Sequence, residues 1–164
     1  MSRRLLSCRQ GSAAAEMALV TPLLIIILLS SVELGRYFHN EHLVVKAVRD
    51  GARFAARHDF SNFDACSGSP GGNVVADTVN LVRTGLRSGG SAQLPGWGTA
   101  TVTVSTSCST GAGGQTMTGI YAGRASGAPI VTVSAVVPYS PLFGNTVFGS
   151  LTLAATQQAA VTGI

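Results

Sequence analysis

A single carboxylate lies inside an apolar stretch close to the start of the sequence. Between Ala13 and Val32, Glu16 is the only charged residue. A lone carboxylate within a membrane-spanning segment costs about 2–3 kcal/mol, so it needs a partner unless it reaches the headgroup boundary. If the chain is cut between Gly11 and Ser12, the new positively charged α-amine of Ser12 lies close to Glu16. The first helical turns also favour a negative charge through the helix dipole.

The apolar stretch around this carboxylate predicts a membrane-spanning helix. About 20 residues of α-helix extend over about 30 Å, the hydrocarbon thickness of a bilayer. Arg3, Arg4 and Arg9 precede the stretch, and such basic clusters favour the cytoplasmic side. We therefore predict a cytoplasmic leader over residues 1–11 and a transmembrane helix over residues 12–33, with the remainder of the chain on the outer side of the membrane.

The helical pattern continues beyond the predicted span. Apolar residues recur at three-, four- and seven-residue spacings among charged ones, which predicts an amphipathic continuation over residues 34–58. Pro22 lacks a backbone donor, so we expect a kink or a loosened turn there. Gly35 and Gly51 also weaken the helix.

The remainder of the chain, residues 59–164, predicts a small extracytoplasmic head. Its Gly-rich segments separate one amphipathic stretch from three stretches with alternating apolar residues. The fold class expected is α+β, a long helix that carries a head with a short antiparallel sheet. The elements expected in the head are a helix over 74–88 that ends at Gly89–Gly90, and strands over 99–106, 129–139 and 150–161.

The distribution of charge argues against a nucleic-acid partner. The formal net charge is +4, from eleven basic and seven acidic residues. Three of the basic residues lie in the predicted leader, so its removal would leave a nearly neutral chain without an evident basic face for phosphates. Membrane lipid is the partner that the composition favours.

The cysteines predict one disulfide in the head. Cys8 lies in the predicted leader, whereas Cys66 and Cys108 lie in the predicted extracytoplasmic part. Two cysteines in an oxidising compartment most simply form a disulfide between them. The alternative is a pair of buried free thiols.

Other residue patterns in the chain give little reason to expect catalysis or a cofactor. His39 and His42 are three residues apart on the predicted helix, whereas the histidines of a zinc-protease helix are four apart. The glycines of residues 111–114 are not followed by the Lys-Ser/Thr of a phosphate-binding loop. We therefore expect no metal, no cofactor and no enzymatic activity, and we expect Trp97 and Tyr121 to be structural anchors.

Three segments of the long helix resemble the TadE-like family, pseudopilins or minor pilins of the tight-adherence (Tad/Flp) pilus system. The leader with Gly11 and with Glu16 at the fifth position after it is similar to type IV prepilins in general. Met17 replaces the aromatic residue usual after this glutamate, and the segment Val131–Phe143 fits the family more loosely. The segments that carry the narrower resemblance are Glu16–Leu24, Val32–Arg36 and Val48–Ala56.

The resemblance implies a function and a set of partners. It implies cleavage after Gly11 by a prepilin peptidase, and subsequent assembly with other pilin subunits through an inner-membrane assembly platform. In a filament, Glu16 would meet the Ser12 amine of its own or a neighbouring subunit and fix the axial register. The competing hypothesis is an unprocessed single-pass membrane protein that presents its head to a binding partner. A secreted protein cut near Ser31 is a third alternative.

Overall fold

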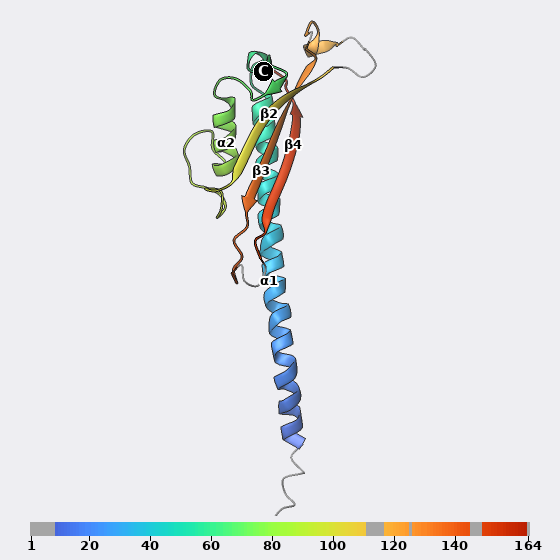
Figure 1. Cartoon of the computed structure of the whole chain (residues 1–164), viewed down its shortest axis with the longest axis vertical. Coiled ribbons are helices and arrows are strands. Elements are labelled where there is room, and N and C mark those ends of the chain that lie inside the picture. Colours follow the sequence, from blue (N-terminus) through green and yellow to red (C-terminus); the bar gives the residue numbers. More distant parts are fainter. Residues whose placement is uncertain (1–8, 111–116, 125, 145–148, 164) are drawn as a thin grey trace, which may run out of the picture. The chain divides into compact units, whose positions relative to one another are not determined.

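The computed structural model has the α+β architecture expected from the sequence (Figure 1). It describes residues 9–110, 117–124, 126–144 and 149–163, while the side chains of Arg9, Gln10 and Ser12 also lie outside the description. The chain divides into two compact units, residues 1–38 and 39–164. The first contains the beginning of the long helix α1 (Arg9–Ala56), and the second contains the end of that helix together with the head.

Helix α1 continues without interruption through all three residues that weaken its pattern, Pro22, Gly35 and Gly51. The turn that we expected to loosen at Pro22 therefore stays helical. After its C-terminal end the chain makes a tighter, 3-10-type turn, because the N–H groups of Arg57 and His58 donate to carbonyls three residues earlier. The carbonyl of Ala56 accepts a hydrogen bond from the Thr162 N–H at 2.8 Å, so the end of the chain caps the end of α1.

The head contains a four-stranded antiparallel sheet in which the strands follow one another in chain order. Burial alternates along β3, where Val131, Val133, Ala135 and Val137 face the core, as the sequence pattern predicts. The short first strand was not predicted, because a two-residue strand has no periodicity of its own. The strands are β1 (Ser67–Gly68), β2 (Thr101–Ser109), β3 (Ala128–Pro138) and β4 (Thr152–Ala160).

Helix α2 (Val74–Thr84) begins where the sequence predicts but ends four residues before Ser88. The cause is Gly85, which adopts a left-handed conformation with φ of +77° and donates its N–H to the Leu81 carbonyl at 2.7 Å. This is the usual glycine cap of a helix, and the sequence prediction placed it at the wrong glycines. Two short 3-10 helices, η1 (Phe60–Phe63) and η3 (Gly119–Tyr121), complete the described elements.

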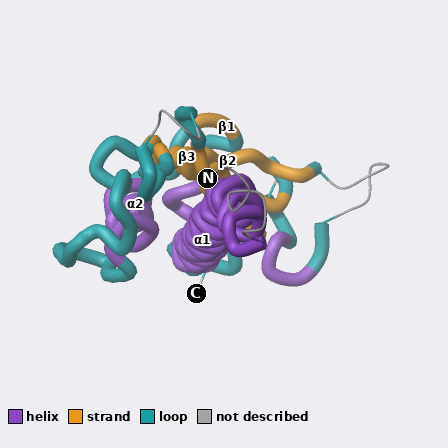
Figure 2. Tube along the Cα trace, turned by 90° about the horizontal axis from the view of Figure 1, so that it is seen from below, coloured by secondary structure: helices purple, strands orange, loops and turns teal. Residues whose placement is uncertain are grey.

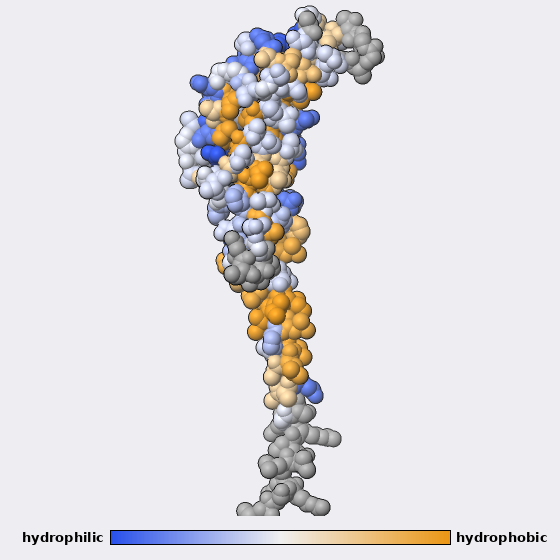
Figure 3. All heavy atoms as spheres, in the orientation of Figure 1, coloured by the Kyte–Doolittle hydropathy of each residue, from blue (hydrophilic) through white to orange (hydrophobic). Residues whose placement is uncertain are grey.

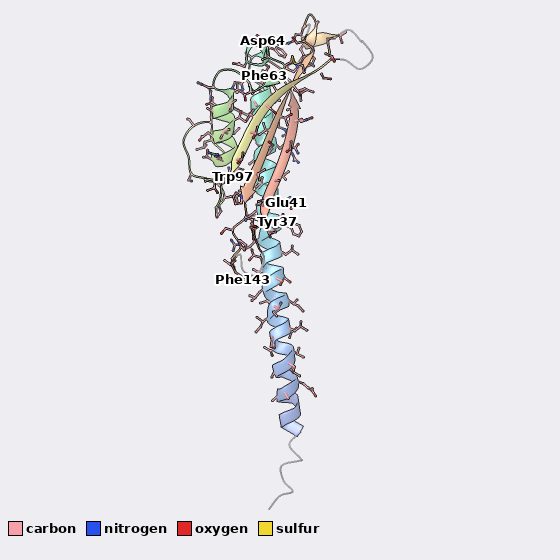
Figure 4. The ribbon with its side chains drawn as sticks, in the orientation of Figure 1. Tyr37, Glu41, Phe63, Asp64, Trp97 and Phe143 are labelled. Atoms are coloured by element: carbon pink, nitrogen blue, oxygen red, sulfur yellow. A yellow bond between two sulfur atoms is a disulfide. The ribbon has the colours of Figure 1, made fainter. Side chains whose placement is uncertain are left out.

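The core of the head lies between the sheet and the two helices, which occupy the same side of the sheet (Figure 2). Val44, Val48 and Ala55 of α1 are almost completely buried, as is Val82 of α2. The two largest fully buried side chains, Trp97 and Phe63, lie at opposite ends of the sheet (Figure 4). Trp97 is thus a core residue, as expected.

Candidate functional site

The predicted cleavage site lies in the first turn of α1. The helix begins at Arg9, so the Gly11–Ser12 bond is helical, and Gly11 is exposed with no atom within 4 Å of the position a Cβ would occupy. Glycine favours the helix weakly, which makes the turn around this bond easier to open. Arg3 and Arg4, predicted to set the topology, lie outside the described residues.

Glu16 lies one helical turn beyond Ser12 on the same helix. The four-residue separation corresponds to a rise of about 6 Å and places both residues on one face. The Glu16 side chain is exposed. A carboxylate in this position can pair with the amine of Ser12 in the cut chain or with a cation of a neighbouring molecule.

Apolar side chains surround α1 beyond Glu16 and form an exposed surface (Figure 3). Met17 is 64% exposed and Leu19 is 80% exposed, and the apolar side chains continue to Val32. By length and composition this helix can cross a membrane. Such a large apolar surface needs lipid or other helices around it.

Two hydroxyl groups within this apolar segment are satisfied by the helix itself. Thr21 donates to the Met17 carbonyl at 2.6 Å, and Ser31 donates to the Ile27 carbonyl at 2.8 Å. In hydrocarbon an unsatisfied hydroxyl is costly, so these bonds suit a segment without access to water. Glu16 is then the one charged group of the apolar segment.

In the head, Cys66 and Cys108 form the disulfide that was favoured from the sequence. Each cysteine lies next to a residue of the β1–β2 pair Ser67↔Ser107, so the covalent link and the strand pairing hold the same two segments together. The loop that the disulfide closes spans a sequence separation of 42 residues.

The segment after α1 is held by several local contacts. Asp59 caps η1, and the N–H of Ser61 that donates to its carboxylate at 2.8 Å lowers the pKa of this group. Arg124 lies over the Phe60 ring, 4.6 Å from its centroid, and pairs with Asp64 at 3.0 Å.

Tyr121 anchors the end of the chain, as expected of it. Its hydroxyl donates to the Val161 carbonyl at 2.8 Å.

Within the described residues, no three His, Cys, Asp or Glu side chains lie close enough together to hold a metal ion.

Two features of α1 were missed from the sequence. Gly51 lies directly against α2 and β3, because a Cβ there would overlap Val82 and contact Val133. In addition, Lys46, Arg49 and Arg53 are all exposed, and the two arginines border β4. Their three- and four-residue spacing was the available signal, but the prediction considered only the nearly neutral net charge expected after removal of the leader.

An exposed apolar helix followed by an α+β head is the arrangement expected of a pilin-like protein with an N-terminal membrane helix. The family model described as TadE-like protein matches residues 11–53, which confirms the resemblance expected from the sequence. The match begins at Gly11 and includes the whole apolar segment. No curated protein and no solved structure matches the chain. The family match supports a pilin-like role in a Tad pilus in general terms.

Proposed function

We propose that the chain is a structural, non-enzymatic minor pilin or pseudopilin of a Tad-type pilus that acts in adhesion or secretion. The observation that carries the proposal is the TadE-like segment on one continuous helix, with Gly11 in its first turn and Glu16 alone among exposed apolar residues. In this proposal a prepilin peptidase cuts after Gly11 on the cytoplasmic side, and the head lies outside the cytoplasmic membrane.

The first step requires the peptidase to open the first turn of α1. Opening is easier at Gly11 than at most residues because glycine favours the helix weakly. Removal of the leader places the positive Ser12 amine one turn before Glu16, where the pair neutralises the charge of the apolar segment. The helix can then leave lipid and pack against neighbouring helices.

Assembly requires that helix contacts replace lipid around the segment Met17–Val32. A contact between different surfaces of neighbouring subunits that does not close into a ring produces an open filament. Pairing of Glu16 with the Ser12 amine of an adjacent subunit would fix the axial register, because a buried unpaired carboxylate is strongly disfavoured. The partners proposed are the prepilin peptidase, other pilin subunits and an inner-membrane assembly platform.

The mature N-terminus tests the processing step. Intact mass and N-terminal sequencing should show a chain that begins at Ser12, and Gly11→Ala should abolish the cut. Gly35→Ala is the matched control, because it makes the same change in the same helix, also with no atom within 4 Å of the new Cβ. An uncut wild-type chain in the membrane would instead favour an anchored binding protein, and a cut near Ser31 would favour secretion.

The role of Glu16 is tested separately. Glu16→Ala should leave processing intact but reduce the incorporation of the chain into pili, measured by fractionation and electron microscopy. Glu41→Gln, which neutralises a carboxylate outside the apolar segment, is the control and should assemble normally. Normal pili that contain the Glu16→Ala chain would refute the register role.

A further inference from the structure

In the part of the chain that the structure describes, no strand pairs with the outer edge of β4, the last strand of the sheet (Figure 1). The hydrogen bonds from Val161 to Pro129 and from Tyr139 to Leu151 fix which residue pairs along β3 and β4 are hydrogen-bonded. By this alternation, Ala154, Thr156 and Gln158 point their N–H and C=O groups away from β3. Their side chains are exposed on the face opposite α1.

This edge lacks the features that usually prevent pairing with another strand. Exposed edges are commonly protected by proline, by charged residues or by a bulge. The nine residues of β4 include no proline and no charged residue, and their register with β3 is uninterrupted. The other side of the sheet is different, because β1 and α2 lie against β2.

Arginines of α1 lie beside this open edge. Gly51 faces Val133 of β3, and Ala52, about 100° further around the helix, borders a groove of about 260 Å³ with Ala159 of β4. Arg49 and Arg53 follow at about 160° and 200° from Gly51, and both line the same groove.

Arg49 and Arg53 are available for a partner. In the described part of the chain, Arg87 pairs with Asp77 and Arg124 with Asp64, and no carboxylate pairs with Arg49 or Arg53. Both arginines are exposed. A fifth strand placed beside β4 would therefore lie next to two unpaired guanidinium groups, which bind carboxylates in a bidentate geometry.

We propose that the β4 edge and the groove lined by Arg49 and Arg53 form a docking site for an extended acidic segment of another polypeptide. The segment adds a strand to β4 through main-chain hydrogen bonds, and its Asp or Glu side chains on the α1 side pair with the arginines. A second copy of this chain docked through its own β4 does not fit, because β4 carries no carboxylate. The site lies within residues 49–160, so it does not depend on cleavage at Gly11.

The test uses the folded full chain in neutral detergent micelles and two capped synthetic peptides of the same length as β4. One peptide alternates valine with glutamate, and the other alternates valine with lysine. The glutamate peptide should bind saturably by fluorescence anisotropy and should protect the amides of Ala154, Thr156 and Gln158 from hydrogen exchange. The lysine peptide should bind at least about tenfold more weakly.

Charge-reversed variants test the role of the arginines. The double variant Arg49→Glu, Arg53→Glu should reverse the preference, so that the lysine peptide binds better. Arg57→Glu is the matched control, because Arg57 is also exposed but does not line the groove, and it should retain the wild-type preference.

Main-chain pairing is tested on both sides of the contact. Thr156→Pro removes an outward N–H and should abolish binding, while circular dichroism verifies that the head is folded. N-methylation of either the valines or the glutamates of the peptide needs no protein variant. Only one of these sets of amides faces β4, so one methylated peptide should bind and the other should not.

Several results would overturn the proposal. The first is that the glutamate peptide shows no saturable binding at about 1 mM. The others are that the glutamate and lysine peptides bind equally, or that the two methylated peptides bind equally. A single-stranded oligonucleotide is the last probe. If it binds through Arg49 and Arg53, is insensitive to Thr156→Pro, and the peptide does not bind, the groove is a polyanion site instead.

Discussion

Gly51 provides the sharpest test of how α1 is attached to the head. A Cβ at this position would overlap Cγ2 of Val82 and lie 3.5 Å from Cγ2 of Thr78 and 3.8 Å from Cγ1 of Val133. Val82 and Val133 are completely buried, and valine has little rotational freedom at χ1. Substitution of Gly51 by alanine must therefore force Val82 from its position or move α2 relative to α1.

The expected magnitude follows from two opposing effects. Overpacking of a well-packed core destabilises a protein by about 1–3 kcal/mol. Alanine also favours the helix over glycine by about 0.5–1 kcal/mol. We expect Gly51→Ala to lower the free energy of unfolding by about 1–2 kcal/mol, equivalent to a decrease of roughly 3–6 °C in Tm.

The assay is thermal and denaturant unfolding of the full chain in detergent, followed by the fluorescence of Trp97, the single tryptophan, which is buried in the head. Gly35→Ala is the control and should not be destabilised, because its Cβ meets nothing within 4 Å.

A double-mutant cycle with Val82→Ala distinguishes steric overlap from a general effect on the helix. Removal of Cγ2 of Val82 leaves space for the new Cβ, so the double variant should be less destabilised than the sum of the single variants by about 1 kcal/mol. A Gly51→Ala chain as stable as wild type, or additive single effects, would show that the close approach of α1 and α2 is not a constraint.

Two further predictions concern the head. Replacement of Cys66 and Cys108 by serine should destabilise it by about 4 kcal/mol, from the entropy of the loop that the disulfide closes, and wild type in a reductant should show the same loss of Tm. Because Ser61 lowers the pKa of Asp59 below its ordinary value of 3.8, the carboxylate stabilises the fold above this pH and loses its effect as the pH falls through the folded-state pKa. The Tm difference between wild type and Asp59→Asn should therefore be present at pH 6 and shrink towards pH 2, and a constant difference would contradict this assignment.

Local sequence patterns determined the main elements of the fold. The apolar run with Glu16 predicted one long helix, and the alternation around Val131–Val137 predicted a half-buried strand, because both signals depend on neighbouring residues only. The pairing of Cys66 with Cys108 was also predictable, since two cysteines in the head have one simple combination. The end of α2 at Gly85 was a misread local signal, because three glycines in this region are suited to a helix cap.

The tertiary structure alone decided which residues meet across the head. Gly51 reads as a weak point of a helix in the sequence, whereas in the structure it is the contact that allows α1 to approach α2 and β3. Likewise, about 100 residues separate Arg49 from Gln157, yet both line one groove. Such contacts depend on how the chain returns to α1 after it has formed α2 and the sheet, and no local periodicity contains that information. The Gly11–Glu16 region, in contrast, could be interpreted from the sequence, because its residues all lie within two turns of one helix.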